Sequence, residues 1–95
     1  MVRHVVCQKF ENKEDAKTAA EMLRALPEKI EPLLSMEVGL DFLGSERSFD
    51  LVLIATFADE AGLHAYDEHP EHAKVRAFIR PRRVGTVSVD YIVEA

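Results

Sequence analysis

The sequence predicts an α+β domain in which an antiparallel sheet of four strands carries helices on one face. The hydrophobic period switches between two and 3.6 residues along the chain, in the order strand, helix, strand, strand, helix, strand. A chain of 95 residues is also long enough for one hydrophobic core and too short for two. We therefore expect residues 1–95 to form a single domain.

The first strand and helix are predicted over the opening third of the chain. Residues 2–10 alternate imperfectly, and both faces of this strand carry apolar groups. Asn12 can cap the helix that follows, because acidic residues occupy its first turn. Apolar residues then recur at helical spacing, namely Ala16, Ala19, Ala20, Leu23 and Leu26. Pro27 ends or kinks this helix, and a short extra turn is expected over residues 28–31.

The remaining strands follow from a period of two. Residues 34–43 alternate, residues 44–48 form a polar turn, and residues 49–57 make the most apolar strand of the chain. Asp59 can cap the next helix, and residues 84–93 form the last strand. This order is the split βαβ arrangement of a ferredoxin-like fold.

The densest group of reactive side chains lies in residues 66–72, Tyr-Asp-Glu-His-Pro-Glu-His. Pro70 has no N–H for a continuing helix and biases His69 away from helical dihedral angles. It is nevertheless well suited to the first position of a new helix. We expect a helix that ends near Asp67, a corner at His69 and a second helix from Pro70. Such a corner can point Tyr66 and His72 towards a common space.

The first and third strands predict an assembly larger than one chain. Helices cover only one face of such a sheet, yet Val5, Cys7, Val52 and Ile54 place apolar groups on the other face. A second copy of the same sheet would cover them and give a symmetric dimer with a barrel-like interior. We therefore expect a homodimer formed through the sheet face.

Composition excludes several classes of protein. A hydrophobic content of 47% with 31% charged residues excludes a disordered chain, and a net charge of −5 argues against nucleic acid as a partner. A single cysteine allows no intrachain disulfide, and no segment approaches the roughly 20 apolar residues of a membrane span, so the cytoplasm is the expected compartment. One local run is basic, and it is read as a solvated helix end or as an anion site: Lys74, Arg76, Arg80, Arg82 and Arg83.

Two stretches resemble the stress-responsive A/B barrel (Dabb) family: the opening Arg-His-Val-Val-Cys-Gln-Lys-Phe of residues 3–10, and residues 66–72, which match its Tyr-x-x-His-Pro-x-His motif. Glu37-Val38-Gly39 and Val89-Asp90-Tyr91 fit the same pattern, so the resemblance covers essentially the whole chain. It implies a dimeric α+β barrel of ferredoxin-like subunits. The family includes plant stress-associated proteins and olivetolic acid cyclase, which performs an intramolecular aldol condensation without a metal or organic cofactor.

Matching positions imply His72 as a catalytic base, with Tyr66 and His4 as further catalytic candidates. His69 corresponds to the other histidine of the motif. Leu51 stands where the cyclase has a pocket histidine, which argues against the same substrate. Pocket residues are expected at His69, Leu51, Phe10, Leu63 and Phe78.

Three functions fit this pattern. One is a non-catalytic dimer that binds a small apolar or aromatic molecule, with a hydrogen-bonded corner at residues 66–72 and a stress-associated role. The second is a cofactor-independent lyase, cyclase or isomerase, in which His72 abstracts a proton beside a carbonyl and Tyr66 donates to the developing enolate. The third is a metal site at His69 and His72, but Pro70 interrupts that spacing, so we assign no metal ligand and no cofactor.

Overall fold

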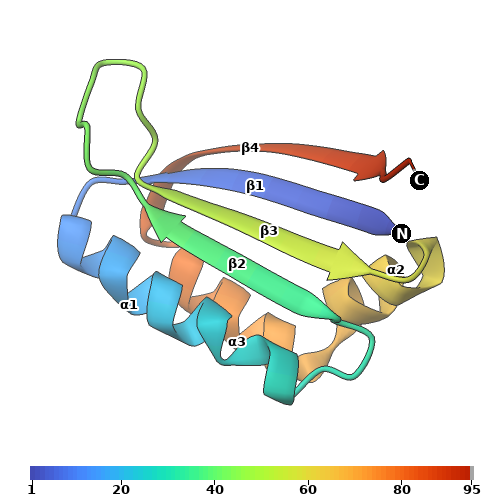
Figure 1. Ribbon diagram of the computed structural model, residues 1–95. Helices are drawn as coiled ribbons and strands as arrows, with labels where there is room; N and C mark the ends of the chain where they lie inside the picture. The colour runs from blue at the N-terminus through green and yellow to red at the C-terminus, as the bar shows by residue number, and fades with distance from the viewer. Residues whose placement is uncertain (95) are drawn as a thin grey trace.

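The computed structural model describes residues 1–94 and has the predicted order of elements (Figure 1). One antiparallel sheet, in the order β2-β3-β1-β4, contains β1 (Val2–Phe10), β2 (Ser35–Leu40), β3 (Leu51–Phe57) and β4 (Arg83–Ile92). Its helices all lie on one face of that sheet: α1 (Lys13–Arg24), the short 3-10 helix η1 (Leu26–Glu28), α2 (Glu60–Glu68) and α3 (Pro70–Ile79). The predicted ferredoxin-like α+β fold is confirmed.

Several predicted boundaries differ from the structure, most of all at three places. The turn after α1 covers Leu26–Glu28 rather than residues 28–31, because Pro27 occupies a first-turn position of a 3-10 helix. Strand β2 ends at Leu40, and Phe42 is 97% exposed in the loop that follows. Strand β3 starts at Leu51 rather than at residue 49, since the carboxylate of Asp50 is buried and accepts a hydrogen bond from the Phe10 N–H at 2.7 Å.

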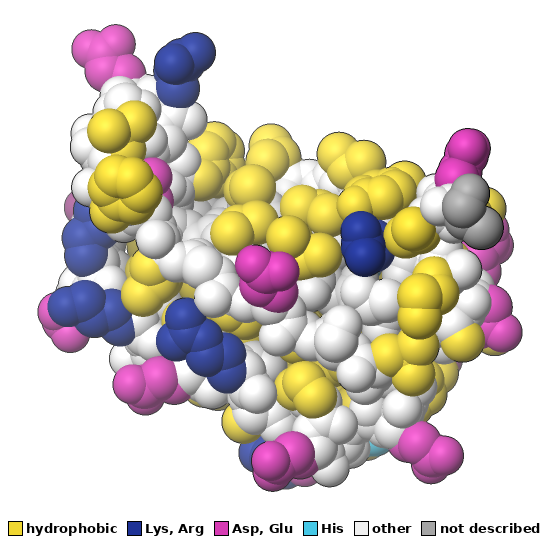
Figure 2. All heavy atoms as spheres, in the orientation of Figure 1, with side chains coloured by type: hydrophobic (Ala, Val, Ile, Leu, Met, Phe, Trp, Pro, Cys, Tyr) yellow, Lys and Arg dark blue, Asp and Glu magenta, His cyan; other side chains and the backbone are white. Residues whose placement is uncertain are grey.

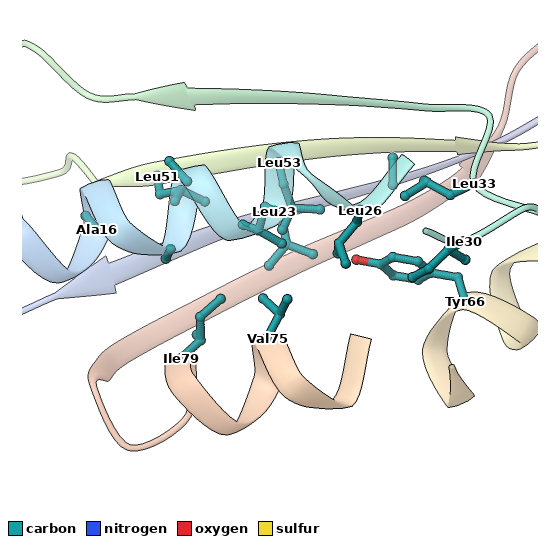
Figure 3. Packing of buried hydrophobic residues seen from close by; sticks show 14 of the residues in the cluster. Ala16, Leu23, Leu26, Ile30, Leu33, Leu51, Leu53, Tyr66, Val75 and Ile79 are labelled. Atoms are coloured by element: carbon teal, nitrogen blue, oxygen red, sulfur yellow. The ribbon is translucent and has the colours of Figure 1, made fainter. Parts of the chain in front are cut away.

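The hydrophobic core lies between the sheet and the helices (Figure 3). Val6 pairs with Leu53 across β1 and β3, and both side chains are buried on the face that the helices cover. Ala19 and Ala20 of α1 are fully buried, since their small side chains let this helix approach the sheet closely. The predicted apolar stripe of α1 is therefore its core face.

The opposite face of the sheet is apolar and uncovered. Its β1 and β3 side chains, Val5, Cys7, Val52 and Ile54, are half-buried by their neighbours. On β4, Val87, Val89 and Tyr91 are 43–62% exposed. Figure 2 shows hydrophobic side chains gathered over the sheet on the side away from the helices. A patch of this extent on a folded domain marks an interaction surface.

Candidate active site

A cavity of about 240 Å³ lies between α3 and the inward faces of β1 and β4. Helix α3 packs against α1 and α2, which holds it over this end of the sheet. The middle of the wall combines apolar side chains, among them Val6, Val75 and Ile79, with the polar Thr86 and Ser88 of β4. Three of the predicted site residues, His4, Tyr66 and His72, line the same cavity although they come from β1, α2 and α3.

The helix break places His72 and fixes its protonated nitrogen. Because Pro70 has no N–H, the Tyr66 carbonyl accepts instead from the N–H of His69, at 3.1 Å. The N–H of Glu71 donates to Nδ1 of His69 at 3.0 Å, so the Asp67 carbonyl is left without its helical donor. Nδ1 of His72 takes that place and donates to the Asp67 oxygen at 3.2 Å. A carbonyl can only accept, so Nδ1 carries the proton and Nε2 remains an acceptor.

The surroundings of His72 favour its neutral form. Burial lowers the pKa of the His72 imidazole below its usual value, and the positive charge of Arg76 lowers it further, against the opposing hydrogen bond to the Asp67 carbonyl. Its ring packs against Tyr66, with 4.3 Å between the ring centroids. At neutral pH this side chain therefore presents an unprotonated Nε2, as a general base requires.

Tyr66 is only 1% exposed, and its ring also packs against Phe57 with 5.2 Å between centroids. Figure 3 shows the ring entering the interior from α2 with its hydroxyl directed toward the space between α3 and the sheet. Burial, together with the negative charge of Asp67, raises the pKa of the Tyr66 phenol above its usual value. The phenol therefore keeps its proton and can donate a hydrogen bond into the cavity.

His4 reaches the cavity from β1 and is held by Asp90. The two residues are directly opposite each other in the β1–β4 register, and Nδ1 of His4 pairs with the Asp90 carboxylate. The ring of His4 lies 6.3 Å from that of Tyr66, centroid to centroid. A histidine that donates from Nδ1 to a carboxylate presents Nε2 to a bound molecule.

Asp90 was not expected as a partner of His4. Its strand alternates between apolar Val87, Val89 and Tyr91 on one face and Thr86, Ser88 and Asp90 on the other. The polar residues of β4 thus lie on the face of the sheet that the helices cover, where apolar residues are usual. Only the register of β4 on β1 shows that Asp90 meets His4.

The five further residues predicted for the pocket lie outside this cavity. Phe10 and Leu51 are buried in the core, and Leu63 and Phe78 pack at its edge. His69 caps α3 through Nδ1. Other residues line the cavity that the sequence had not indicated as pocket residues, above all Gln8, Arg80 and Arg83.

The two histidines of the motif serve separate contacts. Nδ1 of His69 accepts from the Glu71 N–H, whereas Nδ1 of His72 donates to the Asp67 carbonyl.

Within residues 1–94, no group of three or more His, Cys, Asp or Glu side chains is placed to hold a metal ion. None of the helices in that range is long and apolar enough to cross a bilayer.

The fold and the cavity define a ferredoxin-like α+β domain with a histidine-lined pocket between sheet and helices. The chain belongs to the Dabb family, since the family model described as Stress responsive A/B Barrel Domain matches residues 2–93. The predicted family is thereby confirmed. No curated protein sequence matches the chain.

Solved structures with the same fold include proteins described as dimeric. One, from Bacteroides fragilis, is described as a dimeric protein of unknown function with a ferredoxin-like fold; it has a TM-score of 0.86 and 27% identity over 95% of this chain and 93% of that one. A dimeric ferredoxin-like protein of unknown function from Thermobifida fusca gives 0.85 and 24%, over 97% and 90%. Hydroxynitrile lyase from Passiflora edulis gives 0.84 and 16%, over 98% and 93%.

Proposed function

We propose that this protein is a cofactor-independent enzyme of the lyase, cyclase or isomerase class that acts on a small carbonyl compound. The observation that carries the proposal is the meeting of His72, Tyr66 and His4 at one end of a single cavity. A base and a hydrogen-bond donor beside one bound molecule are the two elements that proton abstraction next to a carbonyl requires.

His72 is the base in this proposal. Its Nε2 takes a proton from the carbon next to the substrate carbonyl. The electron pair of that C–H bond forms a carbon–carbon double bond, and the π electrons of the carbonyl move to its oxygen, which gives the enolate. Donating Nδ1–H to the Asp67 carbonyl stabilises the imidazolium that forms. Tyr66 donates a hydrogen bond to the enolate oxygen, and the protonated His72 then returns its proton to the product.

His4 provides a further side chain of the site that can donate a hydrogen bond to the substrate or accept one from it. Its pairing with Asp90 holds the imidazole in one orientation, as the carboxylate of an acid–base pair does. The fold is compatible with an enzyme of the lyase class, because a protein described as a hydroxynitrile lyase has the same fold. Binding of a small apolar or aromatic molecule without reaction is the second candidate function, which the apolar side chains of Val6, Val75 and Ile79 in the cavity wall favour.

Deuterium uptake from D₂O tests the proposal without knowledge of the natural substrate. A panel of small ketones and aldehydes is incubated with the protein, and exchange at the carbon next to the carbonyl is followed by NMR. We expect wild-type protein to accelerate exchange in at least one member. His72→Gln should lower that rate by about 10²-fold or more, since it removes the general base.

His64→Gln is the matched control, because His64 lies on the exposed side of α2 and does not line the cavity. A thermal-shift measurement with the same panel separates the two candidates. Compounds that raise the melting temperature without any exchange would favour binding alone. Equal exchange by His72→Gln and wild type would contradict the catalytic role.

We also propose that the protein is a homodimer assembled through the uncovered sheet face. Two observations support this: the exposed apolar residues of that face, and the dimeric description of the Bacteroides fragilis protein of the same fold. The molecule measures 34 × 29 × 17 Å, so its broad face is large enough for the roughly 800 Å² per partner of a stable interface.

A further inference from the structure

We propose that the cavity takes an elongated substrate with an anionic group, a carboxylate, bound by Arg80 and Arg83 at the end opposite His72. This inference rests on the proposed function and adds the class of substrate to it. Both arginines line the same cavity as the catalytic candidates, where α3 turns into β4.

The length of the cavity follows from the elements that form it. Inward-facing residues of its β1 wall run from His4 through Val6 to Gln8, a span of about 13 Å at the rise of a strand. Helix α3 covers the same distance from His72 to Arg80, about 12 Å at the rise of a helix. At about 240 Å³ the cavity exceeds the roughly 150 Å³ of a cavity that holds benzene, so it has room for a small substrate that extends along it.

Charge is distributed unevenly between the two ends. The acidic side chains of the site belong to the His72 end, where Asp67 faces Arg76 at 3.5 Å and Asp90 pairs with His4. At the other end, Arg80 is exposed and Arg83 is half-buried, and neither takes part in an ion pair within the described residues. Two cations without a paired carboxylate at one end of the cavity favour an anion there, and a carboxylate suits arginine because it accepts paired hydrogen bonds.

Gln8 supplies an independent observation at the arginine end. It lies across from Thr86, near the start of β4, and is only 5% exposed. Its side-chain oxygen is the buried polar atom that finds no hydrogen-bond partner in the described chain. An unpaired buried amide oxygen is costly, and rotation of the amide can offer either a donor or an acceptor to a bound molecule. We assign Gln8 to the recognition of the anionic group.

A matched pair of probes tests this assignment: 7-oxooctanoate and its neutral amide, 7-oxooctanamide, each titrated by calorimetry at pH 7.5 and low salt. Wild-type protein should bind the carboxylate at least tenfold more tightly than the amide. The double variant Arg80→Gln/Arg83→Gln should lose that preference, whereas Arg82→Gln should keep it. Arg82 is the control because it has the same charge in the same turn, but it stacks on Phe78, with 4.0 Å from its guanidinium carbon to the ring centroid, and lies 3.9 Å from Asp15.

Gln8→Leu separates recognition from folding. If Gln8 serves a ligand, this variant should weaken carboxylate binding without lowering the melting temperature, because it removes an unpaired buried amide. A lower melting temperature with unchanged binding would assign Gln8 to folding and remove it from the proposal.

Equal binding of the two probes, no binding of the carboxylate, or an equal loss in Arg82→Gln would overturn the anion site. None of these outcomes affects the proposed acid–base chemistry, which is judged by deuterium exchange in neutral ketones and by His72→Gln. Conversely, a carboxylate preference that depends on Arg80 and Arg83, without any exchange, would support the anion site and contradict the catalytic role.

Discussion

His72 receives its protonation state from the backbone around it. Pro70 interrupts the helix, and the Asp67 carbonyl left without a helical donor accepts from Nδ1 of His72. Arg76 donates to the same oxygen at 2.7 Å, which keeps the carbonyl in place. The residue that breaks the helix thus also leaves Nε2 of His72 free as an acceptor.

Stability should depend on pH through His72. Its folded pKa lies below the unfolded value of about 6.5, so its contribution to stability is present above that pH and is lost as pH falls through the folded pKa. We expect the melting temperature of wild type to fall between pH 7 and 5 and His72→Gln to reduce that fall. Thermal unfolding followed by circular dichroism measures both, and an unchanged slope in His72→Gln would contradict the shift.

At this scale the sequence identified the motif residues and missed their partners. Tyr66 and His72 could be selected because a phenol and two imidazoles gather around a proline in residues 66–72, and His4 because the resemblance to the Dabb family matches its position. Asp90 and Gln8 could not be placed at the cavity, since their roles depend on the strand register and on the height of α3 above the sheet. Neither the strand register nor the distance of α3 from the sheet can be read from a local sequence pattern.

The junction between α2 and α3 depends on His69 as a cap. Replacing His69 with Ala removes the acceptor for the Glu71 N–H and should lower the free energy of unfolding by about 1 kcal/mol. His69→Asn should retain most of the stability, because Asn also caps helices. Chemical denaturation compares the three proteins, and equal loss in both variants would show that the histidine ring matters for another reason.

Asp50 connects the start of β3 to β1 and α1. Burial would raise the pKa of its carboxyl, but the hydrogen bonds from Lys13 and from the Phe10 N–H lower it overall. Asp50→Asn should lower the free energy of unfolding by about 1–3 kcal/mol at pH 7, the value of a charged hydrogen bond. Because the folded pKa is below the unfolded value of 3.8, this contribution should vanish as pH falls through the folded pKa.

Glu46→Gln in the exposed loop before β3 is the control for this measurement. Equal stability of Asp50→Asn and wild type at pH 7, measured by urea unfolding, would contradict the role of the carboxylate. The difference between the two variants should shrink in acid.

The order of helices and strands could be predicted from the hydrophobic periodicity, whereas the first or last residues of several elements could not. Caps at Asn12 and Asp59 were predictable because short polar side chains precede helical patterns, and both accept from the helix they cap. Strand β3 begins later than its apolar pattern, since Asp50 uses its position for tertiary contacts with β1 and α1. Such long-range contacts leave no local signal.

For the whole molecule, the uncovered sheet face predicts association. Val89 of the edge strand β4 lies opposite Val5 on that face and is 62% exposed, so Val89→Lys should fold but place a charge in the interface. We expect sedimentation to give a dimer for wild type and a monomer for this variant. Leu34→Lys is the control, because Leu34 is about as exposed but precedes β2 rather than lying on that face.

The most direct test of the central claim is the ionisation of His72, because the proposed chemistry requires a neutral imidazole with Nε2 free in the cavity. Long-range ¹H–¹⁵N NMR of labelled protein reports which ring nitrogen carries the proton as pH is varied. The structure predicts the Nδ1–H form of His72 at pH 7 and a pKa below 6.5. An Nε2–H form, or a pKa at or above the usual value, would contradict the account.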